Sequence, residues 1–239
     1  MLGTVAIFLT ALLYSSVGHA GASGYLAVMA LLGVAPGVMR PVALALNLLV
    51  ASIGTRTFVR AGHLDWALLW PFLVTSVPMA YLGGRLALPV TIHRTIIGVV
   101  LLASAARFLV QLRAPDTARG APPRPVALAT GAGLGFLAGL TGVGGGIFLS
   151  PLLLLLGWAT LRTTAATSVA FILANSAAGL LGQLGTVREW PPELVPWSIA
   201  VLLGGAIGSH LGARRLPSVA IRATLAVVLL MAGIKLIWG

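Results

Sequence analysis

The sequence predicts an all-α integral membrane protein made of two inverted repeats, each a broken or re-entrant helical hairpin followed by three transmembrane helices. Three observations predict this fold class. Of the 239 residues, 59% are hydrophobic and only 8% are charged, whereas a typical soluble domain has about 25% charged residues. Glycine clusters interrupt two long apolar segments, and the glycine and proline pattern of the first half recurs in the second.

The apolar segments have lengths that distinguish two of them from the rest. They run at about 2–33, 41–59, 66–84, 95–112, 126–157, 163–184, 194–213 and 223–238. Because one span needs about 20 apolar residues, the first and fifth segments are too long for a single span and too short for two. Both contain the glycine clusters, and membrane segments tolerate such breaks only where the freed backbone is buried in protein or lines a cavity.

The second cluster comprises Gly142, Gly144, Gly145 and Gly146. Ser150 suits an N-cap, Pro151 the first helical position, and Gly157 a C-terminal stop. These signals predict a short helix from Gly146 or Ser150 to Leu156. The amides at its start would point into the turn and favour a small anion. Close helix packing is the alternative explanation of the glycines.

The two halves match in order. Gly18-His-Ala-Gly-Ala-Ser-Gly24 aligns with Gly142-Val-Gly-Gly-Gly-Ile-Phe148, and Pro71 and Pro89 align with Pro196 and Pro217 at a nearly constant spacing. We therefore predict a first repeat at 1–112, a polar linker at 113–125 and a second repeat at 126–239.

The distribution of basic residues predicts the topology. If both broken segments are re-entrant, one face carries Arg40, Arg85, Arg94, Arg188 and Lys235, and the other face carries the remaining ten of the fifteen basic residues. That asymmetry follows the positive-inside tendency and makes the halves inverted. Inverted repeats with broken helices that meet near midplane are a common transporter plan.

Residue types exclude several classes of function. The acids Asp65, Asp116, Glu189 and Glu193 lie in or beside predicted loops, cysteine is absent, and the four histidines have no metal-ligand spacing. We expect no enzyme activity, no catalytic residue, no metal and no cofactor. The net charge of +11 shows no dense basic cluster, so we expect no nucleic acid partner.

Polar residues within the apolar segments are the remaining candidates. His19 would serve proton coupling or anion contact, or be a neutral ring bonded to backbone. Ser168 and Asn175 share a helix face and would coordinate an oxyanion or bond between helices. Arg40 would attract anions or be an ordinary loop arginine. The candidate substrate-binding residues are Gly18, His19, Gly21, Ser23, Asn47, Gly142, Gly144, Gly145, Gly146, Ser150, Thr167, Ser168 and Asn175.

A family resemblance rests on three features of the sequence: the duplication, the glycine motif Gly142-Val-Gly-Gly-Gly-Ile-Phe-Leu-Ser-Pro151 and the Ala166-Thr-Ser168 step. Over nearly its whole length the chain resembles the TauE/SafE family of sulfite exporters. The first-half copy departs from the motif at His19, Ala20 and Ala22.

The resemblance implies a transporter of a small sulfur-containing or organic anion, such as sulfite, sulfoacetate or a related sulfonate, bound between the glycine hinges. A passive anion channel and a non-transporting scaffold are the alternatives. The expected partners are a small anionic substrate and the lipid bilayer, with a homodimer as one option for assembly. The expected location is the prokaryotic plasma (inner) membrane, as a multi-pass protein.

Overall fold

The computed structural model describes residues 2–34, 36–86, 120–185 and 190–214, together with isolated positions between 102 and 118 and between 219 and 234. Within these residues the fold is all-helical, as predicted. Its helices are α1 (Leu2–Ser16), α2 (Ala22–Leu31), α3 (Pro36–Arg60), α4 (Trp66–Arg85), α6 (Arg124–Thr141), α7 (Gly146–Leu155), α8 (Leu161–Gln183) and α9 (Leu194–Arg214).

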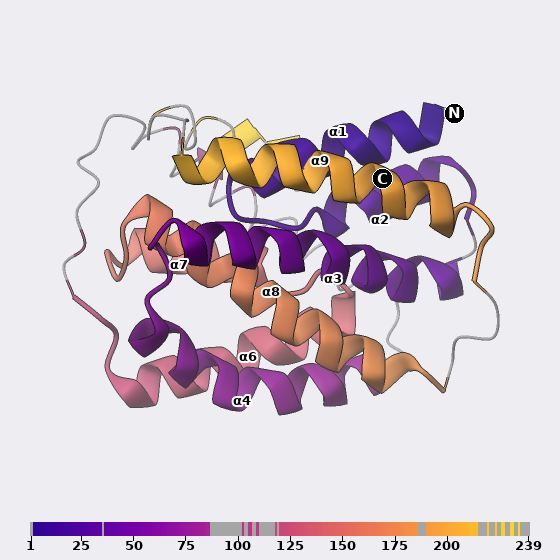
Figure 1. Cartoon of the computed structure of the whole chain (residues 1–239). Coiled ribbons are helices and arrows are strands. Elements are labelled where there is room, and N and C mark those ends of the chain that lie inside the picture. Colours follow the sequence, from indigo (N-terminus) through magenta and orange to yellow (C-terminus); the bar gives the residue numbers. More distant parts are fainter. Residues whose placement is uncertain are drawn as a thin grey trace.

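The helices form three layers (Figure 1): α1 lies beside α9, α4 lies beside α6, and α3 and α8 lie between these pairs. Contacts in one half have counterparts in the other. The α1–α9 contact corresponds to α6–α4, α2–α3 corresponds to α7–α8, and α3–α9 corresponds to α8–α4. Each contact becomes its counterpart when the helices of one repeat are exchanged for the equivalent helices of the other. That the two repeats are inverted relative to one another stays a prediction. Most of the segments 95–112 and 223–238, and residues 113–117 and 119 of the linker, lie outside the described residues.

Within the described part of the chain, four helices are long and apolar enough to cross a membrane: Val38–Arg60, Trp66–Arg85, Leu161–Gln183 and Leu194–Ala213. The two segments predicted to be broken are indeed each divided into two helices, α1 with α2 and α6 with α7. Both α1 and α7 are apolar and shorter than a full span. The interruption therefore coincides with the glycine clusters in both halves.

The start of α7 corrects one prediction. Ser150 is not an N-cap, because the helix begins at Gly146 with Gly145 at the cap position, and Ser150 and Pro151 lie within it. Gly145 has a φ of +82°, a left-handed conformation that glycine adopts without steric cost. The chain therefore turns into the helix before it reaches Ser150. The predicted stop at Gly157 is confirmed, since α7 ends at Leu155 and Gly157 has a φ of +67°.

Glycines spaced one helical turn apart bring the outer helix pairs into backbone contact. A β-carbon at any of them would overlap a carbonyl oxygen of the facing helix. Gly131, Gly135 and Gly139 of α6 face Phe72, Ser76 and Ala80 of α4, and Gly204, Gly208 and Gly212 of α9 face Phe8, Leu12 and Ser16 of α1. Small residues at this spacing let membrane helices approach closely, so these glycines serve packing.

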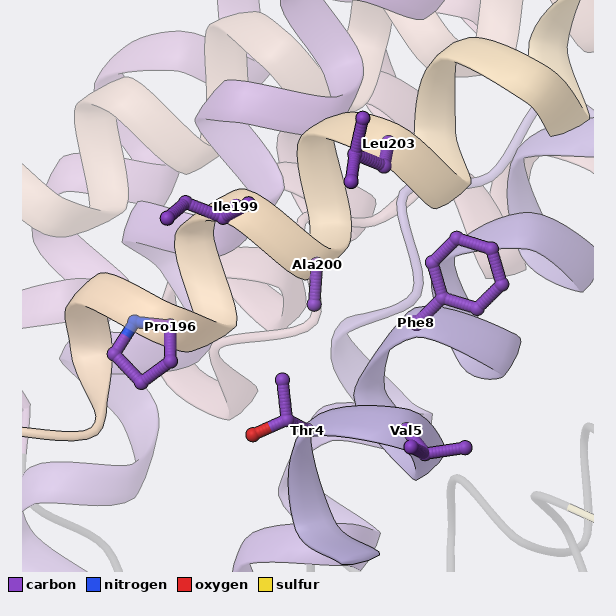
Figure 2. Close-up of a pocket in the computed structure, with 7 residues that line it drawn as sticks. All are labelled: Thr4, Val5, Phe8, Pro196, Ile199, Ala200 and Leu203. Carbon is purple, nitrogen blue, oxygen red and sulfur yellow. The ribbon is translucent and has the colours of Figure 1, made fainter. Parts of the chain in front are cut away.

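An apolar groove of about 360 Å³ lies between α1 and α9. Figure 2 shows its lining, with Thr4, Val5 and Phe8 from α1 and Pro196, Ile199, Ala200 and Leu203 from α9. Val5, Ile199 and Leu203 are each more than half exposed. A groove with this lining offers no charged group to an anion and is typical of a surface that faces lipid.

Candidate functional site

The first hinge is the turn Val17–Gly21 between α1 and α2. Gly18 has a φ of +77° and Gly21 a φ of +105°. The amide of His19 donates to the carbonyl of Tyr14 at 2.9 Å, which ends α1. A β-carbon at Gly18 would overlap the backbone of Ala165 in α8. Gly18 is therefore required both by its left-handed backbone and by its direct contact with α8.

The second hinge is the turn Gly142–Gly145 between α6 and α7. Gly142, Gly144 and Gly145 have φ values of +75°, +80° and +82°. A β-carbon at Gly144 would lie 2.7 Å from Oγ of Ser176 and 2.9 Å from Nδ2 of Asn47. This hinge therefore rests on side chains of α3 and α8.

Two side chains of α3 hold the second hinge in place. Asn47 Nδ2 donates to the carbonyl of Val143 at 3.3 Å and to Ser176 Oγ at 3.4 Å. Arg40 Nη2 donates to the carbonyl of Gly139 at 3.0 Å, where the last turn of α6 leaves carbonyls without helical partners. Arg40 lies in α3 rather than in a loop, so its interpretation as a loop arginine was wrong. Both residues support the position of the hinge.

Each hinge leads into a helix whose first amides are free. At α7, the amides of Phe148 and Leu149 bond to the Gly145 carbonyl, while those of Gly146 and Ile147 have no backbone acceptor in the described part of the chain. At α2, the amides from Ala22 to Gly24 likewise have no partner among the described residues. Such amides carry the positive end of the helix dipole and bind anions readily.

The two hinges meet at one small cavity. Its volume is about 10 Å³, close to the minimum that holds one water molecule. The lining comes from the end of α1, the first hinge, the second hinge, and α7 and α8. Its residues are Tyr14, His19, Ala20, Gly21, Ala22, Ser23, Val143, Ile147 and Ile172.

His19 is buried in this lining, with 2% of its surface exposed. Its Nδ1 lies 3.3 Å from the carbonyl oxygen of Val17, and its ring lies beside the backbone of Gly146 in the second hinge. Its Nε2 is buried and has no hydrogen-bond partner among the residues that the structure describes. An unsatisfied buried nitrogen is costly, and this one belongs to a residue of the cavity wall.

Tyr14 was missed by the sequence reasoning. Its hydroxyl accepts a hydrogen bond from Ser23 Oγ at 2.9 Å, and both residues line the cavity. The available signal was a phenol one turn before His19 in an otherwise apolar segment. Each hydroxyl of this pair can donate or accept, and the one that accepts keeps its own hydrogen for a ligand.

The remaining polar candidates are buried but lie behind the cavity wall. Ser150 Oγ donates to Ser168 Oγ at 2.6 Å, which joins α7 to α8. Asn175 Nδ2 donates to the Phe171 carbonyl at 2.8 Å in its own helix. Thr167 Oγ1 is buried and has no partner within the described ranges. Of the predicted site residues, His19, Gly21 and Ser23 line the cavity directly, and the binding role of the others stays a prediction.

Comparisons with known proteins cover almost the whole chain. The model of the family "Sulfite exporter TauE/SafE" matches residues 3–236. A protein of Sinorhizobium fredii (strain NBRC 101917 / NGR234), described as "Probable membrane transporter protein y4hK", is 42% identical over 238 residues, which cover 98% of this chain and 96% of that protein. No solved structure matches the chain significantly.

Proposed function

Since this chain belongs to the TauE/SafE family of sulfite exporters, which are membrane transporters, we propose that it transports a small sulfur-containing or organic anion that binds between its two hinges. Sulfite, sulfoacetate and related sulfonates are the proposed substrates. The proposed location is the prokaryotic plasma membrane.

The observation that carries this proposal is the convergence of two helix starts on one cavity. Residues at the start of α2 (Ala22, Ser23) and of α7 (Ile147) line it together, and the amides of Ala22 to Gly24 and of Gly146 and Ile147 have no backbone partner among the described residues. Two helix dipoles directed at one point favour negative charge there. The buried, unpaired Nε2 of His19 is an independent sign that the cavity wall is built to meet a ligand.

Among the described residues, the cavity lining contains no lysine or arginine. An anion held there would be bound by backbone amides and by the hydroxyls of Tyr14 and Ser23. Charged residues at membrane depth are costly, and neutral donors in fixed positions attract an anion without that cost. Binding of this kind favours moderate affinity, which lets a carrier release its substrate.

Loading requires the cavity to widen. A volume of about 10 Å³ suits one water molecule, whereas an oxyanion has several heavy atoms. The left-handed glycines on either side are backbone positions that can absorb changes in φ and ψ, as hinge residues do. We propose that movement at Gly18, Gly21 and Gly142–Gly145 opens the cavity first to one side of the membrane and then to the other.

Ligand-dependent stability tests this function. Purified protein is heated with sulfite, sulfate, sulfoacetate or small carboxylates, and a binding anion at about 100 times its dissociation constant should stabilise the fold by about 2.7 kcal/mol. The variant Thr4→Val, in the lipid-facing groove, should respond like the wild type. Liposomes containing the protein should then take up the binding anion saturably. Failure of every anion in both assays would contradict the proposal, and a single-channel conductance would favour a passive channel.

A further inference from the structure

The protonation state of His19 follows from its hydrogen bond to the first hinge. The carbonyl oxygen of Val17 can only accept, so the tautomer that makes the 3.3 Å contact a hydrogen bond has its hydrogen on Nδ1. In a neutral imidazole the other nitrogen then has a lone pair and no hydrogen. Neutral His19, a residue of the cavity wall, then has Nε2 as an acceptor.

This acceptor conflicts with an ionised ligand. The backbone amides and the Tyr14 hydroxyl around the cavity offer hydrogens to an anion. A lone pair at Nε2 would instead face the negative oxygens of that anion, and both would stay unsatisfied in a buried site, at the usual cost of an unpaired polar group. A hydrogen on Nε2 removes the conflict, because the imidazolium donates from both nitrogens.

We propose, on the basis of the function given above, that His19 takes up one proton at Nε2 when the anion binds and that this proton crosses the membrane with the anion. The proton forms an N–H bond to Nε2 as the anion enters, and the Nε2–H donates to an anion oxygen. When the anion leaves on the other side, the proton leaves too, and the ring returns to its neutral form.

Other titratable groups around His19 do not take over this role. Tyr14 of α1 contacts the His19 ring edge-on, with ring centroids 6.5 Å apart, and Tyr25 of α2 donates its hydroxyl to the carbonyl of Ala20. Phenols are neutral near pH 7. The parts of α7 and α8 in the cavity wall, Ile147 and Ile172, cannot titrate. Arg40 of α3 is engaged with the carbonyl of Gly139.

The pH dependence of binding measures the proton. Purified protein is titrated with sulfoacetate between about pH 6 and 8, where carboxylate and sulfonate both stay ionised; if sulfite alone binds, its fully ionised form is the concentration used. If one proton is taken up with the anion, the dissociation constant of the anion from wild-type protein should rise about tenfold for each unit by which the pH is raised. A constant affinity across this range would overturn the proposal.

Two histidine variants locate the proton. His19→Asn keeps an amide that can hydrogen bond but cannot titrate, so we expect weaker binding with no dependence on pH. His63→Asn is the matched control, because His63 contacts the Ala213 carbonyl at 3.1 Å, away from the cavity, and it should keep the wild-type slope. A full slope in His19→Asn would overturn the assignment. If His19→Asn does not fold, the pH dependence of binding to the wild-type protein and the transport experiment described next test the proposal.

Transport against a gradient separates this proposal from the function on which it rests. Wild-type protein is reconstituted in liposomes with the membrane potential held at zero and the outside one pH unit more acidic. One proton per anion supports up to about tenfold accumulation of the anion inside. Exchange of labelled anion without accumulation would overturn proton coupling alone. Absence of both binding and exchange would overturn the proposed function as well.

Discussion

Replacement of Gly18 by alanine should abolish anion uptake while the protein remains folded. The left-handed backbone of Gly18 costs an alanine about 1–2 kcal/mol. In addition, the new β-carbon would overlap the Cα and carbonyl oxygen of Ala165, which are backbone atoms of α8 and cannot rotate away. The first hinge must then move relative to the cavity wall. A displacement of about 1 Å in a preorganised site can cost roughly 100-fold in rate, and we expect a loss of this size in uptake by reconstituted protein.

Gly62→Ala is the control for this result. Gly62 has a φ of +74°, close to that of Gly18, but a β-carbon there meets no atom within 4 Å. Both variants place alanine in a left-handed backbone, but only Gly18→Ala also introduces an overlap with a neighbouring helix. Uptake by Gly18→Ala equal to that by Gly62→Ala would show that the position of the first hinge does not govern transport.

The second large effect is expected from Gly144→Ala. Its β-carbon would lie 2.7 Å from Ser176 Oγ and 2.9 Å from Asn47 Nδ2, so it would displace the side chains that hold the Val143 carbonyl. The amides of Gly146 and Ile147 would lose their alignment, and both anion affinity and uptake should fall by at least about tenfold, the equivalent of one lost hydrogen bond to a charged group. Calorimetric titration and liposome uptake measure the two quantities.

Gly33→Ala controls for the backbone strain at Gly144, because Gly33 has a φ of +72° and open space around its β-carbon position. The double variant Gly144→Ala with Ser176→Gly removes the closest contact and should recover part of the lost affinity. Unchanged affinity in Gly144→Ala would mean that the second hinge does not contact the anion.

The sequence could predict the broken segments because glycine clusters and segment lengths are local properties. Both breaks occur where glycine permits a left-handed backbone, at Gly18 and Gly21 and at Gly142–Gly145. The same local reasoning was wrong at Ser150, because the left-handed Gly145 starts α7 a full turn before the capping signal. When two start signals compete, the backbone conformation that glycine alone permits determines where the helix begins.

The partners of polar side chains could not be predicted, because they depend on packing between helices that are distant in sequence. For Ser168, contact with an anion and a bond between helices were both open, and its hydroxyl bonds to that of Ser150 across α7 and α8. Asn47 reaches the Val143 carbonyl of the other half. Spacing along one helix places such groups on one face, but it does not say which neighbouring helix that face meets.

The two hinges also differ in chemistry. The second is formed by glycine and valine only, whereas the first contains His19 and joins Tyr14 to Ser23. We infer that the second hinge supplies backbone amides and that the first supplies the titratable and hydroxyl groups. His19 is a position at which the first half departs from the family motif. In our proposal, this residue makes anion transport depend on a proton.

The location of a bound oxyanion tests the central claim most directly. Selenite has the shape of sulfite, and its selenium gives an anomalous X-ray signal that can be located without ambiguity in crystals of the protein. We expect one selenium peak within hydrogen-bonding reach of the amides at both helix starts, Ala22–Gly24 and Gly144–Ile147, and of His19 Nε2. A peak that contacts only one hinge, or that lies elsewhere in the molecule, would contradict a shared anion site.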